Sequence, residues 1–223
     1  MKTIQFFAWG IATAGVMLSS CASMNKTQKG ATAGVAGGAV VGGIVGKLLG
    51  NTAAGVIVGA TVGGATGAII GRRMDRQAEE MKQVLGDAEV KRVGEGIVVE
   101  FKDKVLFGFD QSELSTSARA NLDKLDEVLR KYPDTNIEIL GHTDDKGSHE
   151  YNQGLSERRA AAAAAYLRSN GIAASRVTTR GLGETDPKVS NDTEDNRAEN
   201  RRVEFVITAN QQMIDAAKKE SGN

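Results

Sequence analysis

Glycine recurs at every fourth position through one part of the chain, and this ladder separates two physical regimes. Its rungs are Gly30, Gly34, Gly38, Gly42, Gly46, Gly50, Gly55, Gly59, Gly63, Gly67 and Gly71. Residues four apart share one face of a helix, so a second helix could approach this stripe closely. Glycine costs about 1 kcal/mol per position relative to alanine in a helix interior. Such a segment therefore needs an apolar partner to be helical.

The break at residues 51–54 divides the ladder into two segments, which predicts a helical hairpin over residues 30–73. Lys47 is the only charged residue between Gly30 and Gly71, and Arg72 and Arg73 end the ladder. A hairpin would return the chain to the side of the membrane on which it started, so the lipid anchor and the C-terminal domain would stay in one compartment. Three interpretations stay open: packing on itself or on copies in a homo-oligomer, insertion in a membrane, and a flexible glycine-rich spacer. Hydropathy alone does not separate them.

The first twenty residues are typical of an export signal, with Lys2 before an apolar stretch over residues 4–18. That stretch is short for a spanning helix, which needs about 20 apolar residues. Residues 18–21 read LSSC and resemble the lipobox of bacterial lipoproteins. The resemblance implies acylation of Cys21, with a palmitate-type lipid anchor, followed by a tether over residues 21–29. In lipoproteins of this kind, aspartate after the acylated cysteine favours retention at the inner membrane. This chain has Ala22 at that position, so the resemblance favours the outer membrane.

A charged linker helix is expected over residues 74–92, with Met81 and Val84 among its few apolar positions. From about Val93 to residue 209 the composition is that of a globular domain. The tail over residues 210–223 is compatible with a frayed helix or with disorder.

Alternating apolar patterns in this domain predict strands and amphipathic helices. Ser115 is the expected N-cap of a helix that Pro133 ends, and the alanine-rich run over residues 156–167 predicts a second helix. An antiparallel hairpin is expected around residues 102–104. The predicted strands are residues 97–101, 105–109, 137–140, 177–180 and 203–207. The fold class is α+β, with helices packed on one side of a mixed four-stranded sheet.

Four motifs carry a resemblance to a known family. They are LFGFD at residues 106–110, GHTD at 141–144, YNQGLSERRA at 151–160 and NRRVE at 200–204. Together they closely resemble the OmpA-like peptidoglycan-binding domain, which also occurs in peptidoglycan-associated lipoproteins and flagellar stator proteins. The match covers roughly residues 95–208. With the lipobox and the glycine zipper, the whole chain resembles YiaD-like outer-membrane lipoproteins.

This resemblance implies non-covalent binding of peptidoglycan by an outer-membrane lipoprotein that faces the periplasm and links that membrane to the wall. The expected ligand is the diaminopimelate side chain, which carries an ammonium and a carboxylate. The resemblance assigns the ammonium to Asp144 and the carboxylate to Arg159, whose planar fork can donate two parallel hydrogen bonds. The same carry-over places in the pocket Asp110, Thr143, Asn152, Leu155 and Arg202. The choice between the neighbours Arg201 and Arg202 stays open.

Each leading assignment has a structural alternative. Asp144 could cap its own loop, Arg159 could be a solvated helix charge, and Asp110 could be a turn former after a strand.

Rival functions are weaker on the sequence. The formal net charge is zero, so no basic face for nucleic acid is indicated. A metal site for wall hydrolysis could be drawn from His142, Asp144, Asp145 and His149, but no H-E-x-x-H spacing is present. No G-x-S-x-G elbow or full G-x-G-x-x-G motif is found. We therefore expect no enzyme activity, no cofactor and no metal. The alternative function is a membrane-active or channel-like zipper oligomer that uses the wall domain only as an anchor.

Overall fold

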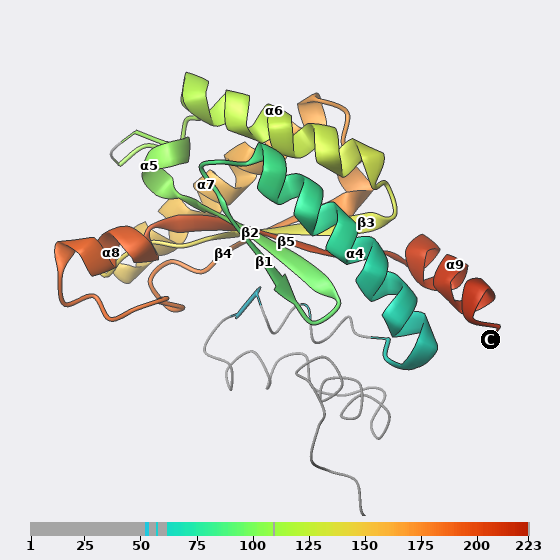
Figure 1. The fold of residues 1–223 in the computed structure, drawn as a ribbon. Coiled ribbons are helices and arrows are strands. Elements are labelled where there is room, and N and C mark those ends of the chain that lie inside the picture. Colours follow the sequence, from blue (N-terminus) through green and yellow to red (C-terminus); the bar gives the residue numbers. More distant parts are fainter. Residues whose placement is uncertain (1–51, 54–56, 58–61, 109, 223) are drawn as a thin grey trace, which may run out of the picture.

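The computed structural model describes residues 52–53, 57, 62–108 and 110–222 (Figure 1). The predicted export signal, Cys21, the tether and the first glycine segment lie outside the described residues.

A five-stranded mixed sheet in the order β1-β2-β5-β3-β4 forms the centre of the domain (Figure 1). All neighbours pair antiparallel except β3 and β4, which are parallel. The strands are β1 (Glu89–Val93), β2 (Gly96–Lys102), β3 (Thr135–Gly141), β4 (Val177–Gly181) and β5 (Arg202–Ala209). The α+β class is confirmed, with five strands in place of the four expected.

The predicted hairpin around residues 102–104 is wrong. Residues Asp103–Leu106 form a short helix, α5, and Phe107 makes only an isolated bridge with Leu114. The reason is tertiary: β2 pairs with β1 on one side and β5 on the other, so a strand returning from β2 has no free edge. Leu106 and Phe107 are buried in the core instead.

The helix expected over residues 74–92 is also displaced. Helix α4 (Gly64–Val84) begins inside the glycine ladder, and residues 89–93 form a strand. Its start is marked by Gly63 and Gly64, both with positive φ, a conformation that glycine adopts without strain. The helix packs through Ile69, Ile70, Met74 and Met81, whereas Val84 is 39% exposed. No helix in the described part of the chain is long and apolar enough to cross a membrane.

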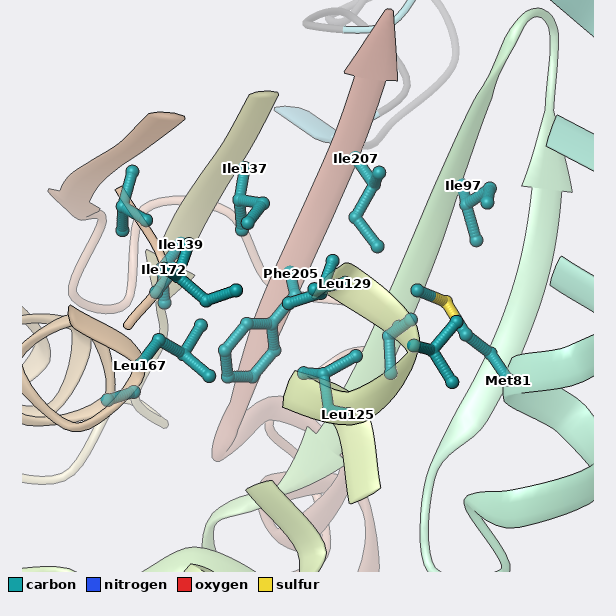
Figure 2. Close-up of a cluster of buried hydrophobic side chains, with 14 of the residues drawn as sticks. Met81, Ile97, Leu125, Leu129, Ile137, Ile139, Leu167, Ile172, Phe205 and Ile207 are labelled. Carbon is teal, nitrogen blue, oxygen red and sulfur yellow. The ribbon is translucent and has the colours of Figure 1, made fainter. Parts of the chain in front are cut away.

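Helices cover one face of the sheet, and the main core lies between these helices and the sheet (Figures 1 and 2). On this face Phe101 and Phe205 meet edge to face with ring centroids 5.8 Å apart. Ser115 caps α6 as predicted, because its side chain accepts a hydrogen bond from the Ala118 amide. The remaining helices are α6 (Thr116–Lys131), α7 (His149–Ser169), η1 (Ala174–Arg176), α8 (Glu194–Asn200) and α9 (Gln211–Ser221).

The C-terminal tail is a packed helix. Asn210 caps α9 by accepting a hydrogen bond from the Met213 amide at 3.0 Å. Met213 and Ala217 are buried in the main core, and α9 lies against α4. The sequence left a frayed helix and disorder open, and the structure shows instead a capped helix that packs on the core.

Candidate functional site

The order β2-β5-β3 in the sheet brings several of the motif residues to one end of the domain. Lys102, at the end of β2, pairs with Arg202 at the start of β5, and Gly141, at the end of β3, pairs with Val203. The loops that leave β2 and β3 and the loop that enters β5 therefore meet there. Asp103 follows the end of β2, the predicted site residues Thr143 and Asp144 follow the end of β3, and Arg201 precedes β5.

Two glycines let α7 lie directly on this end of the sheet. A Cβ on Gly141 would be 2.2 Å from the Ser156 carbonyl oxygen, and one on Gly181 would be 2.7 Å from the Glu157 amide nitrogen. Any side chain at either position would push the helix away. The close approach fixes the part of α7 that carries Arg159.

Four side chains form what we call the charge cluster: Asp103, Asp144, Arg159 and Arg201. Arg201 Nη1 lies 2.5 Å from Asp144 Oδ2, and its Nε lies 3.7 Å from Asp103 Oδ2. Arg159 Nη2 is 3.4 Å from the same Asp103 oxygen. The two arginines and two aspartates thus make a connected set in which Asp144 and Arg159 are linked through Asp103 and Arg201.

Arg159 has two further contacts. Its Nε donates to the Gln111 carbonyl at 3.0 Å, and its guanidinium lies 5.2 Å from the centroid of the Phe107 ring. The residue is only 2% exposed. Burial lowers the pKa of Arg159, an effect that the Asp103 charge opposes. The alternative of a solvated helix charge is therefore wrong.

Burial also raises the pKa of Asp103, against the opposing effect of Arg159 and Arg201. Desolvation thus outweighs attraction for this carboxylate. A cluster of partly desolvated, internally paired charges can exchange its internal partners for an ammonium and a carboxylate without a change in net charge.

The loop around Asp144 is ordered by backbone contacts. Asp144 Oδ1 accepts a hydrogen bond from the Lys146 amide at 3.0 Å. Its carbonyl accepts from Thr143 Oγ1 at 2.9 Å and from Asn152 Nδ2 at 3.3 Å. Thr143 and Asn152 are buried and position Asp144, and Leu155 on α7 is also buried. Asp144 therefore caps its loop with one oxygen and pairs with Arg201 through the other.

Asp110 lies at the rim of the site. Its φ of 57° is left-handed, and its carboxylate accepts a hydrogen bond from the hydroxyl of Tyr151, an exposed residue at the start of α7. The turn role and a place near the predicted pocket are both compatible with this position.

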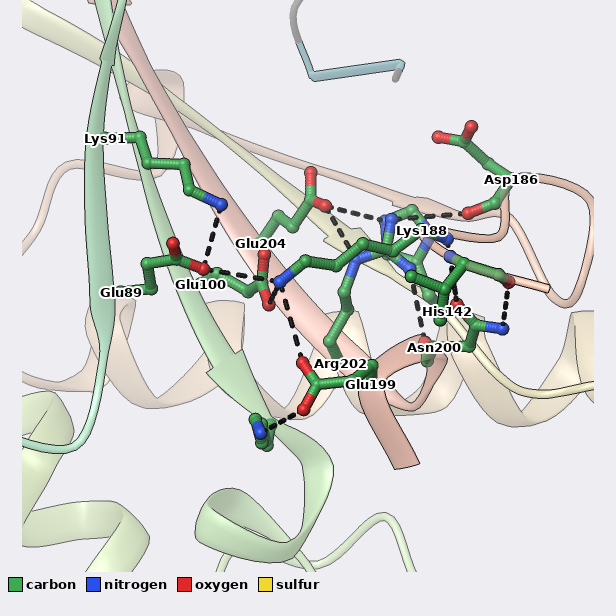
Figure 3. Close-up of polar contacts among 12 residues, drawn as sticks. Glu89, Lys91, Glu100, His142, Asp186, Lys188, Glu199, Asn200, Arg202 and Glu204 are labelled. Carbon is green, nitrogen blue, oxygen red and sulfur yellow. Dashed lines mark hydrogen bonds and ion pairs between the residues drawn. The ribbon is translucent and has the colours of Figure 1, made fainter. Parts of the chain in front are cut away.

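Arg202 does not join the charge cluster. It is almost fully buried, and its Nε donates to Glu204 Oε1 at 2.8 Å while Nη1 and Nη2 donate to the carbonyls of Asn200 and Asp186 (Figure 3). Adjacent residues at the start of a strand point to opposite sides, so Arg201 and Arg202 are separated. The structure brings Arg201, and not the Arg202 chosen from sequence, to Asp144.

Asp103 has no signal in the sequence that marks it as a site residue. It lies in the stretch expected to be a hairpin turn, and only the α5 helix brings it under both arginines. Arg201 could have been found from the NRR motif, but its orientation depends on the strand register. Within the described residues, no group of three histidine, cysteine or acidic side chains is arranged to hold a metal.

Two family models match the chain. The OmpA family matches residues 106–201, and the YMGG-like Gly-zipper matches residues 1–75. The first match lies inside the globular domain, and the second includes the glycine ladder.

Individual relatives agree with these matches. The outer-membrane lipoprotein YfiB of Pseudomonas aeruginosa is 39% identical over 115 residues, 52% of this chain and 68% of that protein. The Escherichia coli lipoprotein YiaD is 36% identical over 119 residues, 53% of this chain and 54% of YiaD. The structure of the cell wall anchor of the T6SS from Pseudomonas aeruginosa aligns with a TM-score of 0.54 and 27% identity, covering 61% of this chain and 97% of that one.

The chain spans between 16% and 68% of the length of eight curated relatives that it matches. The similarity therefore belongs to shared segments of proteins that differ elsewhere.

Proposed function

Because this chain belongs to the OmpA family, we propose that its C-terminal domain binds peptidoglycan non-covalently through the diaminopimelate residue of the stem peptide. The observation that carries the proposal is the charge cluster, in which the buried Arg159, the partly buried Arg201 and two aspartates converge at one end of the sheet. An amphoteric side chain needs one anion and one cation at short range, and this cluster supplies both.

Binding would proceed by exchange of partners. The ligand ammonium takes the place of Arg201 beside Asp144, and the ligand carboxylate accepts hydrogen bonds from Arg159. Arg201, released from Asp144, remains near Asp103 and becomes available to the same carboxylate. Charge-assisted hydrogen bonds contribute about 1.5–3 kcal/mol each, which suits reversible capture. Repetition of the ligand along the wall would add avidity.

The proposal extends to the anchor. Acylation of Cys21 would hold the chain at the outer membrane with the domain facing the periplasm, which the names of YfiB and YiaD as lipoproteins support. The domain would then link that membrane to the wall. A binding role without catalysis fits the description of the aligned structure as a cell wall anchor.

A sacculus pull-down of the purified chain tests the site. Asp144→Asn preserves the shape of the side chain and removes its charge, so we expect affinity to fall by about ten- to a hundredfold, the equivalent of one charge-assisted hydrogen bond. Arg159→Lys keeps the charge and removes the fork, and should weaken binding in the same direction. Free diaminopimelate should release the wild-type chain.

Arg158→Lys is the matched control, because Arg158 is the exposed neighbour of Arg159 on the same helix. It should bind as the wild type does. Arg202→Lys is the second control and should change stability more than binding. An Asp144→Asn chain that melts cooperatively and binds sacculi with wild-type affinity would refute the proposed site.

A further inference from the structure

The sheet has a second apolar face, opposite the helices α4, α6 and α7. We call it the outer face and define it by Val98, Leu140 and Val206, all buried. Within the described residues, the buried hydrophobic side chains that pack on it are Ala53 and Ile57. Ala53 lies in the break between the two glycine segments and Ile57 lies in the second segment, so both are far from the strands in sequence.

The fit between this segment and the outer face is close. Ala53 and Ile57 are each 1% exposed. A Cβ on Gly96, the first residue of β2, would lie 2.6 Å from Ile57 Cγ1. Ile57 therefore occupies the space that a side chain at position 96 would fill.

Polar contacts hold the segment at the two ends of the outer face. The Thr52 amide donates to Asp186 Oδ2 at 3.0 Å, in the loop after β4 and so at the end that carries the charge cluster. The Val62 and Gly63 amides donate to the Glu95 carboxylate at 2.8 and 3.1 Å. Glu95 lies in the β1–β2 turn, at the opposite end of the sheet.

We propose that the outer face is the docking surface for this chain's own second glycine-rich segment and the break before it, which contact the domain through Thr52, Ala53, Ile57 and Val62. A side chain buried on the sheet is not simultaneously exposed to lipid. In this docked state the segment packs on the sheet of the C-terminal domain and is not inserted in a membrane.

Docking also reaches the charge cluster, a consequence that rests on the proposed function. Leu182 packs against the outer face, and the next residue, Gly183, is hydrogen-bonded to two residues near the charge cluster. Its carbonyl accepts from the Thr143 amide at 2.9 Å, and its amide donates to Ser156 Oγ at 3.0 Å. Thr143 directly precedes Asp144. A docked segment therefore holds the loop that supports the Asp144 turn.

Disulfide trapping in the full chain, in isolated native membranes, tests the docking. In the pair Ile57→Cys with Gly96→Cys, the sulfur at position 57 would sit where Cγ1 now lies, beside the new Cβ. Ile57→Cys with Glu127→Cys is the matched control, since Glu127 is exposed on α6 and α6 covers the helical face. We expect the first pair to oxidise with about tenfold higher yield, because docking raises the effective concentration of the two thiols. Equal yields would overturn the proposal.

A second measurement guards against misfolding at Gly96, whose Cβ would also lie 2.9 Å from the Ile207 carbonyl oxygen. Ile57→Cys alone should label slowly with a maleimide, and adding Val98→Asp beneath it should speed labelling about tenfold by undocking the segment. A thiol in lipid would stay protected in both backgrounds. Persistent protection, or fast labelling from the start, would overturn the docking.

Neither readout needs a ligand, so the two proposals fail separately. Trapped disulfide with no sacculus binding would overturn the proposed function alone. Sacculus binding without trapping would overturn the docking alone.

Discussion

Arg159 and Arg202 are both almost fully buried, yet they have different surroundings. Arg202 donates to Glu204 and to two backbone carbonyls, so its fork is used by the fold. Arg159 lies 3.4 Å from Asp103, which is longer than an ordinary hydrogen bond, and stacks on Phe107. A guanidinium held by an aromatic ring, one backbone carbonyl and a loose ion pair is suited to taking a new carboxylate partner.

His142 is the residue whose titration should be visible in stability. Burial, with a further contribution from the positive charge of Arg202, holds the pKa of His142 well below its usual range. Its Nε2 lies 3.8 Å from Glu204, whose own pKa burial raises. As the pH falls, His142 therefore takes up a proton in the unfolded chain while it stays neutral in the folded one. The stabilising contribution is full above about pH 6.5 and is lost at about 1.4 kcal/mol per pH unit as the pH falls toward the folded pKa.

Urea denaturation between pH 7 and pH 5 measures this effect. We expect His142→Gln to flatten the acid loss, whatever its effect at pH 7. His149→Gln is the control, because His149 is the other histidine and its side chain is 59% exposed. Glu204 acts with the opposite sign and is present in all three chains. A wild-type acid slope in the His142 variant would contradict the prediction.

At the scale of elements, α4 shows that two rungs of the glycine ladder have different roles. Gly67 faces the β1–β2 turn, where a Cβ would lie 2.2 Å from Glu95 Oε1, the oxygen that accepts from the Gly63 amide. At Gly71 nothing lies within 4 Å of such a Cβ. The same period in sequence therefore contains one glycine needed for contact and one that only weakens the helix.

This contrast predicts that alanine stabilises the protein less at position 67 than at position 71. Gly71→Ala should raise the free energy of unfolding by up to about 1 kcal/mol through helix propensity. Gly67→Ala gains the same propensity but displaces Glu95 and its contacts to the start of α4, at a cost of about 1 kcal/mol. Chemical denaturation of the two variants side by side should show Gly67→Ala lower by about that amount. Equal stabilisation would mean that Glu95 does not hold this end of the helix.

At the scale of the molecule, the two ends of the described domain stabilise each other. α9 packs on α4 through Met213 and Ala217, Thr66 Oγ1 lies 3.0 Å from Ser221 Oγ, and Arg73 pairs with Glu220 at 2.9 Å. The exposed ion pair contributes little, so the buried apolar contacts should dominate.

Removing residues 210–223 tests that view. We expect the truncation to lower the free energy of unfolding by about 2–4 kcal/mol, because it uncovers the α4 side of the core. Removing residues 222–223 alone is the control and should change little. Urea denaturation followed by circular dichroism gives both values. An unchanged midpoint for the longer truncation would show that α9 adds no net stability.

The sequence by itself determined the local and periodic features of the domain. The α+β class follows from apolar periodicity, the start of α6 from Ser115 as an N-cap, and the family from four motifs whose order needs no structure. These depend on interactions between residues near one another in the chain, which a pattern records directly.

Only the tertiary structure decided which partners the remaining residues find. The segment after β2 turned into α5 because both edges of β2 were already paired, and this placed Asp103 under two arginines. The register of β5 sent Arg201 to Asp144 and Arg202 to Glu204. Each outcome depends on strands far apart in sequence competing for the same hydrogen-bonding edge, and no local pattern contains that competition.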